Sequence, residues 1–344
     1  MLLIIDGSSL LTTNYFATLP KQILFEKDPE KQAAYYDQIM QSSDGIYTNG
    51  IYGFLKTLLL LQKFQNPTHI MIAFDKSRDT FRRRIYADYK GQRGATPEPL
   101  KQQYITLENL LQDAGFAVEY SDEYEADDFA GTAADKFCEL MPVRIYTKDQ
   151  DYFQLVNDSK NIRLWLVVQK EKRDALIEKY CNSAIGEDIS QYNSAPPTCF
   201  EFTELTTEDY YGAVPSLVPD LKGITGDTAD NIPGVKGVSS AASPLLKEYG
   251  SLEGIYEAID TCSNEKVLTD FWKNGLGIKR NPLNALKEYR DLAFLSRDLA
   301  TIRRDCPLTH SIEDMAVSNV NSDKFRQLCL ELDMKSLWAD TPRI

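Results

Sequence analysis

The runs LLII (residues 2–5) and HIMIAF (residues 69–74) are short and apolar, and a helical pattern from about Gly50 to Gln65 separates them. Short apolar runs predict buried strands, and the order strand, helix, strand predicts a parallel pair. The same alternation continues, with strands expected at 116–120, 143–147 and 162–167 and helices expected at about 99–114, 126–140 and 152–156. The sequence therefore predicts an α/β fold in which helices flank a mostly parallel central sheet.

The second half of the chain follows a different pattern. From about Thr206 onward, short helical patterns alternate with Gly- and Pro-rich turns, most clearly in GITGDTADNIPGVKGV at residues 223–238. We expect an α/β core over residues 1–205, a helical subdomain over residues 206–310, and a tail over residues 311–344 that packs on the core. Residues 20–45, which are polar, and residues 168–203, which contain KEKR and a proline pair, are expected to form surface excursions.

Composition limits the class of protein. The 344 residues are 43% hydrophobic, which is enough for a sizeable core. The start MLLIID has no basic leader, and the apolar run Leu58–Leu61 is too short to span a bilayer. The six cysteines include no CxxC pair, so neither a zinc site nor a disulfide framework is indicated. We expect a soluble, cytoplasmic monomer that does not contact a membrane.

The charge is unevenly distributed. The net charge is −13, although most proteins that bind nucleic acid carry a basic surplus. Residues 76–101, however, contain eight basic residues against three acidic ones. One basic segment in an acidic protein permits contact with a phosphate backbone, because a local positive field attracts anions whatever the total charge.

Several acids follow predicted strands, at the edge where parallel sheets bind ligands. These acids are Asp6, Asp75, the pair Asp127 and Asp128, and the pair Asp149 and Asp151. The two histidines, His69 and His310, are interpreted as structural or solvated. Mg²⁺ prefers carboxylate oxygens, and two such ions about 4 Å apart can activate water and offset charge in phosphodiester hydrolysis. Catalysis is therefore expected to depend on acids.

Five ordered blocks carry a resemblance to a known family. The blocks are IIDGSS (4–9), FD (74–75) with TFRRRIYADYKGQR (80–93), EADD (125–128), TKDQD (147–151) and GDTADNIPGVKGV (226–238). They closely resemble the 5′ nuclease domain of bacterial DNA polymerase I and the phage and cellular flap endonucleases, and LAFLSRDLATIRRDCPL (292–308) resembles the end of that domain. The resemblance implies a PIN-like, resolvase-like nuclease core, a helical arch at about 78–112 and a helix-hairpin-helix type motif at about 223–250.

The resemblance also implies a metal site with two Mg²⁺ ions, for which Mn²⁺ can substitute. The residues implied for one ion are Asp6, Asp75, Glu125, Asp127, Asp128 and Asp149, and those implied for the second are Asp151, Asp227 and Asp230. A single acid such as Asp128 could instead be a helix cap or a first-turn acid that complements the helix dipole. The whole set is not explained in this way, because nine converging like charges would repel one another without bound cations.

In the basic segment, the resemblance implies that Lys90 contacts the scissile phosphate and that Arg93 stabilises the transition state. Both cations would oppose the negative charge that develops on the phosphate. The implied DNA contacts are Arg82 and Arg83, which would grip the backbone, and Tyr89, which would stack on an unpaired base. The alternative is a solvated basic helix face, and Arg84 fits that alternative as well as a DNA contact.

The hairpin motif is implied to bind duplex DNA through backbone amides, and to hold K⁺ in relatives. The residues implied at this contact are Gly234, Gly237, Ser239 and Ser240. The chain departs from the family here, because Ser239 replaces a glycine and the lysine that follows has no counterpart. Ser243 followed by Pro244 predicts that the next helix begins there, which is later than in the family. We therefore expect weaker anchoring of the duplex.

The sequence as a whole predicts a metal-dependent 5′-3′ exonuclease and 5′ flap endonuclease that acts in replication, by processing RNA primers and Okazaki fragments, and in repair. A DNA polymerase is an expected partner, and polymerase activity is not expected of this chain. Two interpretations of the chain stay open, a stand-alone enzyme and an excised domain. Three alternatives stay open: a non-catalytic DNA-structure binding paralogue, a PIN-type ribonuclease, and a phosphatase that uses residues 147–151. The nine acids argue against the first, and the Gly-rich helical half argues against the second.

Overall fold

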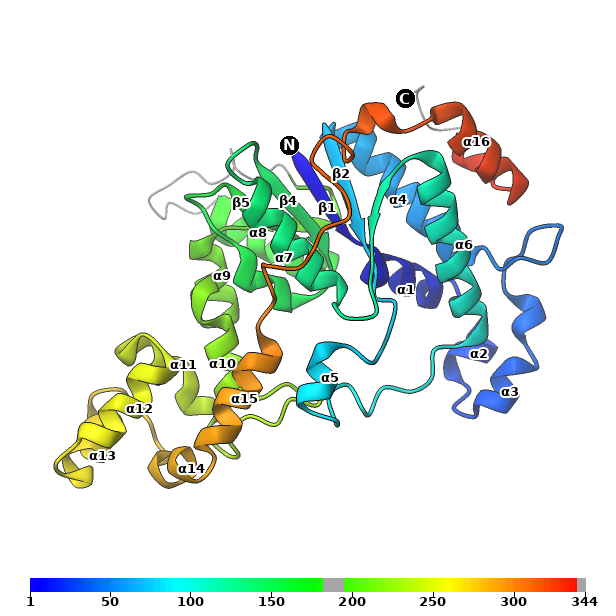
Figure 1. The fold of residues 1–344 in the computed structure, drawn as a ribbon. Helices are drawn as coiled ribbons and strands as arrows, with labels where there is room; N and C mark the ends of the chain where they lie inside the picture. The colour runs from blue at the N-terminus through cyan, green and yellow to red at the C-terminus, as the bar shows by residue number, and fades with distance from the viewer. Residues whose placement is uncertain (182–194, 339–344) are drawn as a thin grey trace.

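The computed structural model describes residues 1–181 and 195–338. Its centre is a six-stranded sheet with the order β3-β2-β1-β4-β5-β6 (Figure 1). The strands are β1 (Leu2–Asp6), β2 (His69–Ala73), β3 (Ala117–Glu119), β4 (Val143–Thr147), β5 (Ile162–Val167) and β6 (Cys199–Phe202). All neighbouring strands pair in parallel except β6, which is antiparallel to β5. The predicted mostly parallel sheet is confirmed.

Apolar residues on both faces of each strand explain why helices cover both sides of the sheet. On β1, Leu3 and Ile5 belong to one hydrophobic cluster, and Leu2 and Ile4 belong to another. The first cluster is shared by α1 (Gly7–Ala17), α4 (Asn49–Gln65), α6 (Glu98–Ala114) and α16 (Ser322–Glu331). The second is shared by α7 (Ala126–Phe137) and the 3₁₀ helix η2 (Gln150–Leu155). Strands buried on both faces are typical of parallel sheets.

The expected surface excursions contain regular elements that the sequence pattern did not reveal. Residues 20–45 include the short helices α2 (Lys21–Phe25) and α3 (Pro29–Ala33). Residues 168–203 include α8 (Lys170–Cys181) and the edge strand β6, while residues 182–194 lie outside the described part. Five-residue helices are too short to show a clear period, so no hydrophobic pattern indicated α2 and α3.

The expected arch range, 78–112, contains two different structures. Its first part holds the short helix α5 (Phe81–Ile85) and a mostly exposed loop that reaches to about residue 97. Its second part belongs to α6, which buries Leu100, Leu107 and Leu111 in the core. The apolar face of α6 packs on the sheet layer (Figure 1), whereas the first part buries a few separate side chains, Thr80, Arg82 and Tyr89.

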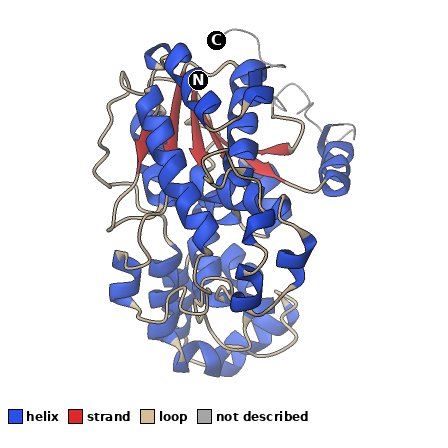
Figure 2. Ribbon diagram, turned by 90° about the vertical axis from the view of Figure 1, so that its right-hand side faces the viewer, coloured by secondary structure: helices blue, strands red, loops and turns tan. Residues whose placement is uncertain are grey.

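A helical half follows the sheet and lies below it in Figure 2. Its helices are α9 (Glu204–Tyr211), α10 (Val218–Thr225), α11 (Ser239–Tyr249), α12 (Leu252–Thr261), α13 (Glu265–Asn274), α14 (Leu283–Glu288) and α15 (Arg290–Ala300). They share a hydrophobic cluster of their own, which includes Ile224, Leu245 and Trp272. Helices α10 and α15 pack so closely that a Cβ atom on Gly223 would lie 2.9 Å from the carbonyl oxygen of Ala293.

The start of α11 corrects the prediction that this helix begins at Ser243. It begins at Ser239, and Pro244 lies inside the helix. The turn before it contains Gly237 at φ +78°, and Ala241 and Ala242 of the first turn are buried in the helical cluster. Burial of these small residues fixes the helix start, so the Ser-Pro signal is overridden by packing. The helix ends before Gly250, as predicted.

The chain returns to the core after α15. The amide of Ile70 donates to the carbonyl of Met315 at 2.8 Å, and the amide of Val317 donates to Thr68 at 2.9 Å. Helix α16 then packs on α6, and its Phe325 ring lies 5.6 Å, between ring centroids, from that of Phe116, which follows α6. No helix in residues 1–181 or 195–338 is long and apolar enough to cross a membrane.

Candidate active site

The first group of predicted acids lies at the carboxyl edge of the sheet. Asp6 is the last residue of β1, Asp75 follows β2 by two residues, and Asp149 follows β4 by two residues. Glu125 and Asp127 stand at the start of α7, which follows β3. Because β1, β2, β3 and β4 are parallel neighbours, their carboxyl ends bring these side chains to one edge.

Local hydrogen bonds hold the first two acids in place. Asp6 accepts the amide of Ser9 at 2.9 Å, which caps α1, and the hydroxyl of Thr147 at 2.7 Å. Asp75 accepts the amide of Ala126 at 2.9 Å and so ties the end of β2 to the start of α7. These bonds orient both carboxylates by main-chain and neighbouring groups before any ligand arrives.

Asp127 has a buried oxygen without a hydrogen-bond partner. Its Oδ1 accepts no hydrogen bond, and Arg82 Nη1 lies 3.9 Å away. Burial and the negative charge of Asp128 raise the pKa of Asp127 well above its usual range. Burial and the charge of Asp75 raise the pKa of Asp6 to about 6. Buried carboxylates without enough counter-charge are the environment in which a bound cation removes a large free-energy cost.

Asp128 and Arg82 correct two predictions, because they form a buried structural pair. Both side chains are at most 1% exposed, and the guanidinium contacts the two carboxylate oxygens at 2.7 Å each. Asp128 also accepts the amides of Glu125 and Arg303. Four donors use the lone-pair positions of its oxygens, so Asp128 is a helix-capping residue that has no oxygen left for a metal ion. Arg82 is too buried to grip DNA.

Tyr89 corrects a third prediction. It is 4% exposed, so its ring is not available to stack on a base. Its hydroxyl donates to Glu125 at 3.1 Å and to Asp230 at 3.3 Å, which joins the basic segment to two of the acids. Lys90 donates from Nζ to Glu125 at 2.7 Å. Burial opposes ionisation of Glu125, but Lys90 and Arg82 outweigh it and lower the pKa of Glu125 to about 2.

The second group of predicted acids is held by the protein's own cations. Arg93 Nη2 lies 2.5 Å from Asp230, and Lys90 Nζ lies 3.7 Å from the same carboxylate. Lys222, which the sequence pattern did not single out, contacts both Asp151 and Asp227. Despite burial, the charge of Asp151 holds the pKa of Lys222 above its usual range.

These ion pairs bear on which acids of the cluster could bind a divalent cation. Within the described residues, no three His, Cys, Asp or Glu side chains are arranged as a complete metal-binding group. The acids of the first group are nevertheless of the right chemistry for a hard divalent cation, and Asp127 supplies a free oxygen. The residues of the first group therefore fit one such ion, whereas the second group is already neutralised in part by cationic side chains.

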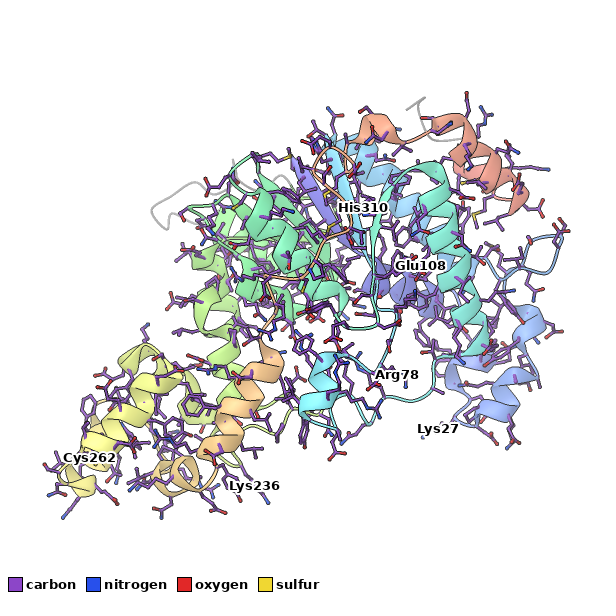
Figure 3. All side chains as sticks on the ribbon, in the orientation of Figure 1. Lys27, Arg78, Glu108, Lys236, Cys262 and His310 are labelled. Carbon is purple, nitrogen blue, oxygen red and sulfur yellow. The ribbon has the colours of Figure 1, made fainter. Side chains whose placement is uncertain are left out.

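The rest of the basic segment faces solvent. Arg83 and Arg84 are exposed, and Arg84 forms an ion pair with Glu123. Arg78, which precedes α5, donates to the carbonyls of Arg93 and Gly94, which follow α5, and so joins the two ends of this segment. Figure 3 shows Arg78 between α5 and the core. Arg83 keeps its predicted availability for DNA, since successive residues of a helix point about 100° apart and only Arg82 faces inward.

At the hairpin, Gly234 is structural. Its amide donates to Ser296 Oγ at 2.9 Å, and a Cβ atom there would lie 2.2 Å from the nitrogen of Gly226. The prediction that Gly234 contacts DNA is therefore wrong, because its amide is used inside the protein. Gly237, Ser239 and Ser240 are exposed at the start of α11, where helix amides are free.

Two basic side chains accompany these amides. Lys236 is exposed and lies at the edge of the helical half in Figure 3. Arg280 is also exposed, and its Nη1 would lie 3.3 Å from a Cβ atom on Gly237. Sequence reasoning missed Arg280, because it lies more than forty residues from Gly237 along the chain and reaches it only through the fold.

Two family models match the chain. Residues 1–181 match the model described as "5'-3' exonuclease, N-terminal resolvase-like domain", and residues 213–323 match the one described as "5'-3' exonuclease, C-terminal SAM fold". The chain belongs to the 5′-3′ exonuclease family. A 5′-3′ exonuclease of Aquifex aeolicus is 30% identical, with 100% of this chain and 96% of that protein covered. The expected enzyme class, a nuclease, is confirmed by this membership.

Other family members are longer proteins. DNA polymerase I of Bacillus caldotenax is 31% identical and covers 97% of this chain, but only 32% of its own length is matched. The chain thus spans about a third of the polymerase relatives that it matches. Among solved structures, the T5 D15 protein co-crystallised with metal ions has a TM-score of 0.56 at 17% identity, with 98% of each chain covered. This likeness supports the fold described above for this chain, and nothing beyond the fold.

Proposed function

We propose that this chain hydrolyses DNA phosphodiester bonds at 5′ ends and 5′ flaps with the help of divalent cations. The observation that carries the proposal is the unpartnered buried oxygen of Asp127, in a cluster where burial raises the pKa of both Asp127 and Asp6. The basic segment containing Lys90 and Arg93 lies directly beside this cluster. An anionic backbone and a cation thus have neighbouring places to bind.

The first group of acids would hold the cation. Its residues are Asp6, Asp75, Glu125, Asp127 and Asp149. A bound divalent cation lowers the pKa of a water molecule and offsets the charge on the phosphate. Relatives of this fold include a T5 5′-exonuclease with bound zinc and a T5 flap endonuclease in a complex with DNA and metal ions. We propose Mg²⁺ as the resident ion, with Mn²⁺ as a substitute.

Lys90 and Arg93 would bind the reacting phosphate. In the structure they are paired with Glu125 and Asp230, and their side chains are 23% and 50% exposed. A phosphate that enters beside the cluster would offer both cations a further anionic partner. The ammonium and guanidinium groups would then oppose the charge that develops during displacement.

The hairpin would anchor the intact duplex. The exposed start of α11 presents the amides of Ser239 and Ser240, and Lys236 and Arg280 lie nearby. Helix N-termini favour anions, and basic side chains add attraction to the phosphate backbone. Because α11 begins at Ser239, its first amides would remain available to the duplex, and weaker anchoring stays a prediction. K⁺ binding at the hairpin and a DNA polymerase as partner belong to the same proposal, with replication and repair as the setting.

The test compares three substrates with Mg²⁺: a 5′-flap duplex, a single-stranded RNA and a small phosphate ester. We expect cleavage of the flap duplex, and 5′- and 3′-labelled strands will distinguish flap removal from stepwise exonuclease action. Asp127→Ala should abolish cleavage and leave duplex binding largely intact, because Asp127 holds the cation rather than DNA. Cleavage of RNA alone would favour the ribonuclease alternative, and binding without cleavage would favour the non-catalytic paralogue.

Asp135→Ala is the matched control. Asp135 lies on the same helix, α7, but its carboxylate pairs with Lys160 at 2.6 Å on the surface. Loss of this pair is expected to change stability by less than about 1 kcal/mol and to leave cleavage unchanged. If Asp127→Ala retained more than about a tenth of the wild-type rate, the proposed role of the first group would be wrong, since a metal ligand supplies several kcal/mol of transition-state stabilisation.

A further inference from the structure

Lys222 is a buried cation inside the carboxylate cluster. It lies on α10, and its side chain is 6% exposed. Its Nζ donates to Asp151 and, at 2.7 Å, to Asp227 Oδ2. These two acids are the ones that the family resemblance assigned to the second metal ion, together with Asp230. The ammonium therefore stands between two ligands that were expected to share a metal ion.

Lys222 differs from the other cations of the cluster in how it is held. Lys90 and Arg93 lie on the mostly exposed segment after α5, from which they can turn towards a phosphate. Lys222 instead follows the buried Leu221 on α10, and its neighbour Gly223 is in tight contact with α15. The helix fixes the base of the Lys222 side chain close to the acids, and the ammonium contacts two of them.

The two groups of acids consequently differ in charge compensation. In the first group, Asp127 keeps an oxygen without a hydrogen-bond partner. In the second group, Lys222 contacts two carboxylates and Arg93 contacts the third. An ammonium group supplies one positive charge and three donors, which satisfy carboxylates without a metal ion. A divalent cation that enters the second group would be repelled by this positive charge and would have to displace the ammonium.

We propose that Lys222 is a resident counter-ion that takes the place of the second divalent cation between Asp151 and Asp227. The chain then binds one divalent cation tightly and a second one only weakly, by displacing the ammonium. The inference rests on the metal-dependent function proposed above and assigns to Lys222 the control of metal stoichiometry. Lys222 is a positioning residue in this role, because it acts on the acids rather than on the DNA.

The experiment is calorimetric titration of Mn²⁺ into the full chain after its metal ions have been removed by a chelator. The wild type should show one tight binding event and one weak event. In Lys222→Met, which keeps the length of the side chain but not its charge, the weak event should become at least roughly tenfold tighter, because a competing positive charge a few ångströms away is gone. Lys222→Arg should retain the weak second event.

Lys160→Met is the matched control, since it also removes one lysine charge but from a surface pair with Asp135. It should leave both binding events unchanged. Thermal unfolding provides a second readout: without metal, Lys222→Met should be less stable than the wild type, and Mn²⁺ should raise its stability more. This readout applies even if the metal-free variant is partly unfolded, because added Mn²⁺ should then restore folding.

Two equally tight events in the wild type, or a second event that is unaffected in Lys222→Met, would overturn the role of Lys222. Such a result would leave the proposed function standing. A different result would contradict the proposed function itself: no Mn²⁺ binding to the wild type, with the same titration curve for Asp127→Ala. The two failures are therefore distinguishable in one set of titrations.

Discussion

Arg82 offers a sharp test, because sequence reasoning and the structure assign it different roles. The family resemblance made Arg82 a DNA contact, whereas the structure buries it against Asp128. Its Nε donates to the carbonyl of Leu299 at 2.9 Å, and its Nη2 donates to Thr301 at 2.9 Å. The residue thus joins α5, the start of α7 and the end of α15. Replacing it by methionine removes all of these bonds and leaves a buried carboxylate without its cation.

The expected cost follows from this geometry. Removing one partner of a buried ion pair costs about 3–5 kcal/mol, since the remaining charge is left uncompensated. Two backbone carbonyls also lose a donor, which adds about 1 kcal/mol each when they cannot reach water. We expect Arg82→Met to lower the free energy of unfolding by at least about 5 kcal/mol. Adding Asp128→Asn should recover part of this loss, because asparagine is neutral and its single side-chain oxygen can still accept one of the two amides that Asp128 accepts.

Urea unfolding followed by tryptophan fluorescence measures the effect, and Arg83→Ala is the control on the exposed side of the same helix. Arg83→Ala should change stability by no more than about 0.5 kcal/mol. It should weaken binding of a flap duplex, with a smaller dependence on salt. An Arg82→Met protein with wild-type stability and poor DNA affinity would refute the structural role and restore the predicted DNA contact.

Three further predictions concern other parts of the molecule. Lys90→Ala should lower single-turnover cleavage far more than DNA affinity, because its contact is proposed to strengthen as charge builds on the phosphate. Rapid-quench kinetics and binding measurements separate the two effects. Arg280→Ala should weaken duplex binding and reduce the slope of log affinity against log salt by about one unit. Binding across a salt series measures this slope, with Lys279→Ala as the neighbouring control. Burial raises the pKa of Glu108 to about 7, although the charge of Lys76 opposes the shift. The native protein therefore binds more protons than the unfolded chain between about pH 5 and 7. It loses stability as the pH rises through this range. Glu108→Gln should reduce this loss by at least about 1 kcal/mol between pH 5 and pH 8 in urea titrations.

Each of these predictions has a contrary result. Equal losses of rate and affinity in Lys90→Ala would make Lys90 one of several backbone clamps. An unchanged salt slope in Arg280→Ala would mean that the hairpin amides bind phosphate without Arg280. A Glu108→Gln protein with the same pH dependence as the wild type would show that Glu108, which Figure 3 labels on α6, is ionised as freely in the folded protein as in the unfolded chain.

The sequence predicted the sheet and the position of the acids because both depend on local patterns. Apolar runs such as LLII and HIMIAF mark buried strands, and parallel pairing brings their carboxyl ends to one edge. Asp6 and Asp75 could therefore be placed together from the amino-acid sequence alone. Prediction failed where packing decides between two local signals, as at α11, which begins at Ser239 although Ser243 and Pro244 offered a stronger start.

The direction of single side chains was also beyond the sequence. Arg82, Arg83 and Arg84 are identical in type and adjacent, so no pattern distinguishes the one that faces inward. The inward position is set by Asp128, forty-six residues away along the chain. Lys222 was missed for the same reason, because its acidic partner Asp151 comes from the other half of the molecule.

Long-range cation partners give the nine predicted acids unequal roles. Arg82 neutralises Asp128, and Lys90 lowers the pKa of Glu125. The second group is compensated by arginine and lysine side chains, whereas Asp127 keeps a free oxygen. If counter-charge decides where a divalent cation binds, affinity should follow these pairings rather than the number of acids. The net charge of −13 then describes the surface poorly, because several of the charges that matter are paired inside the cluster.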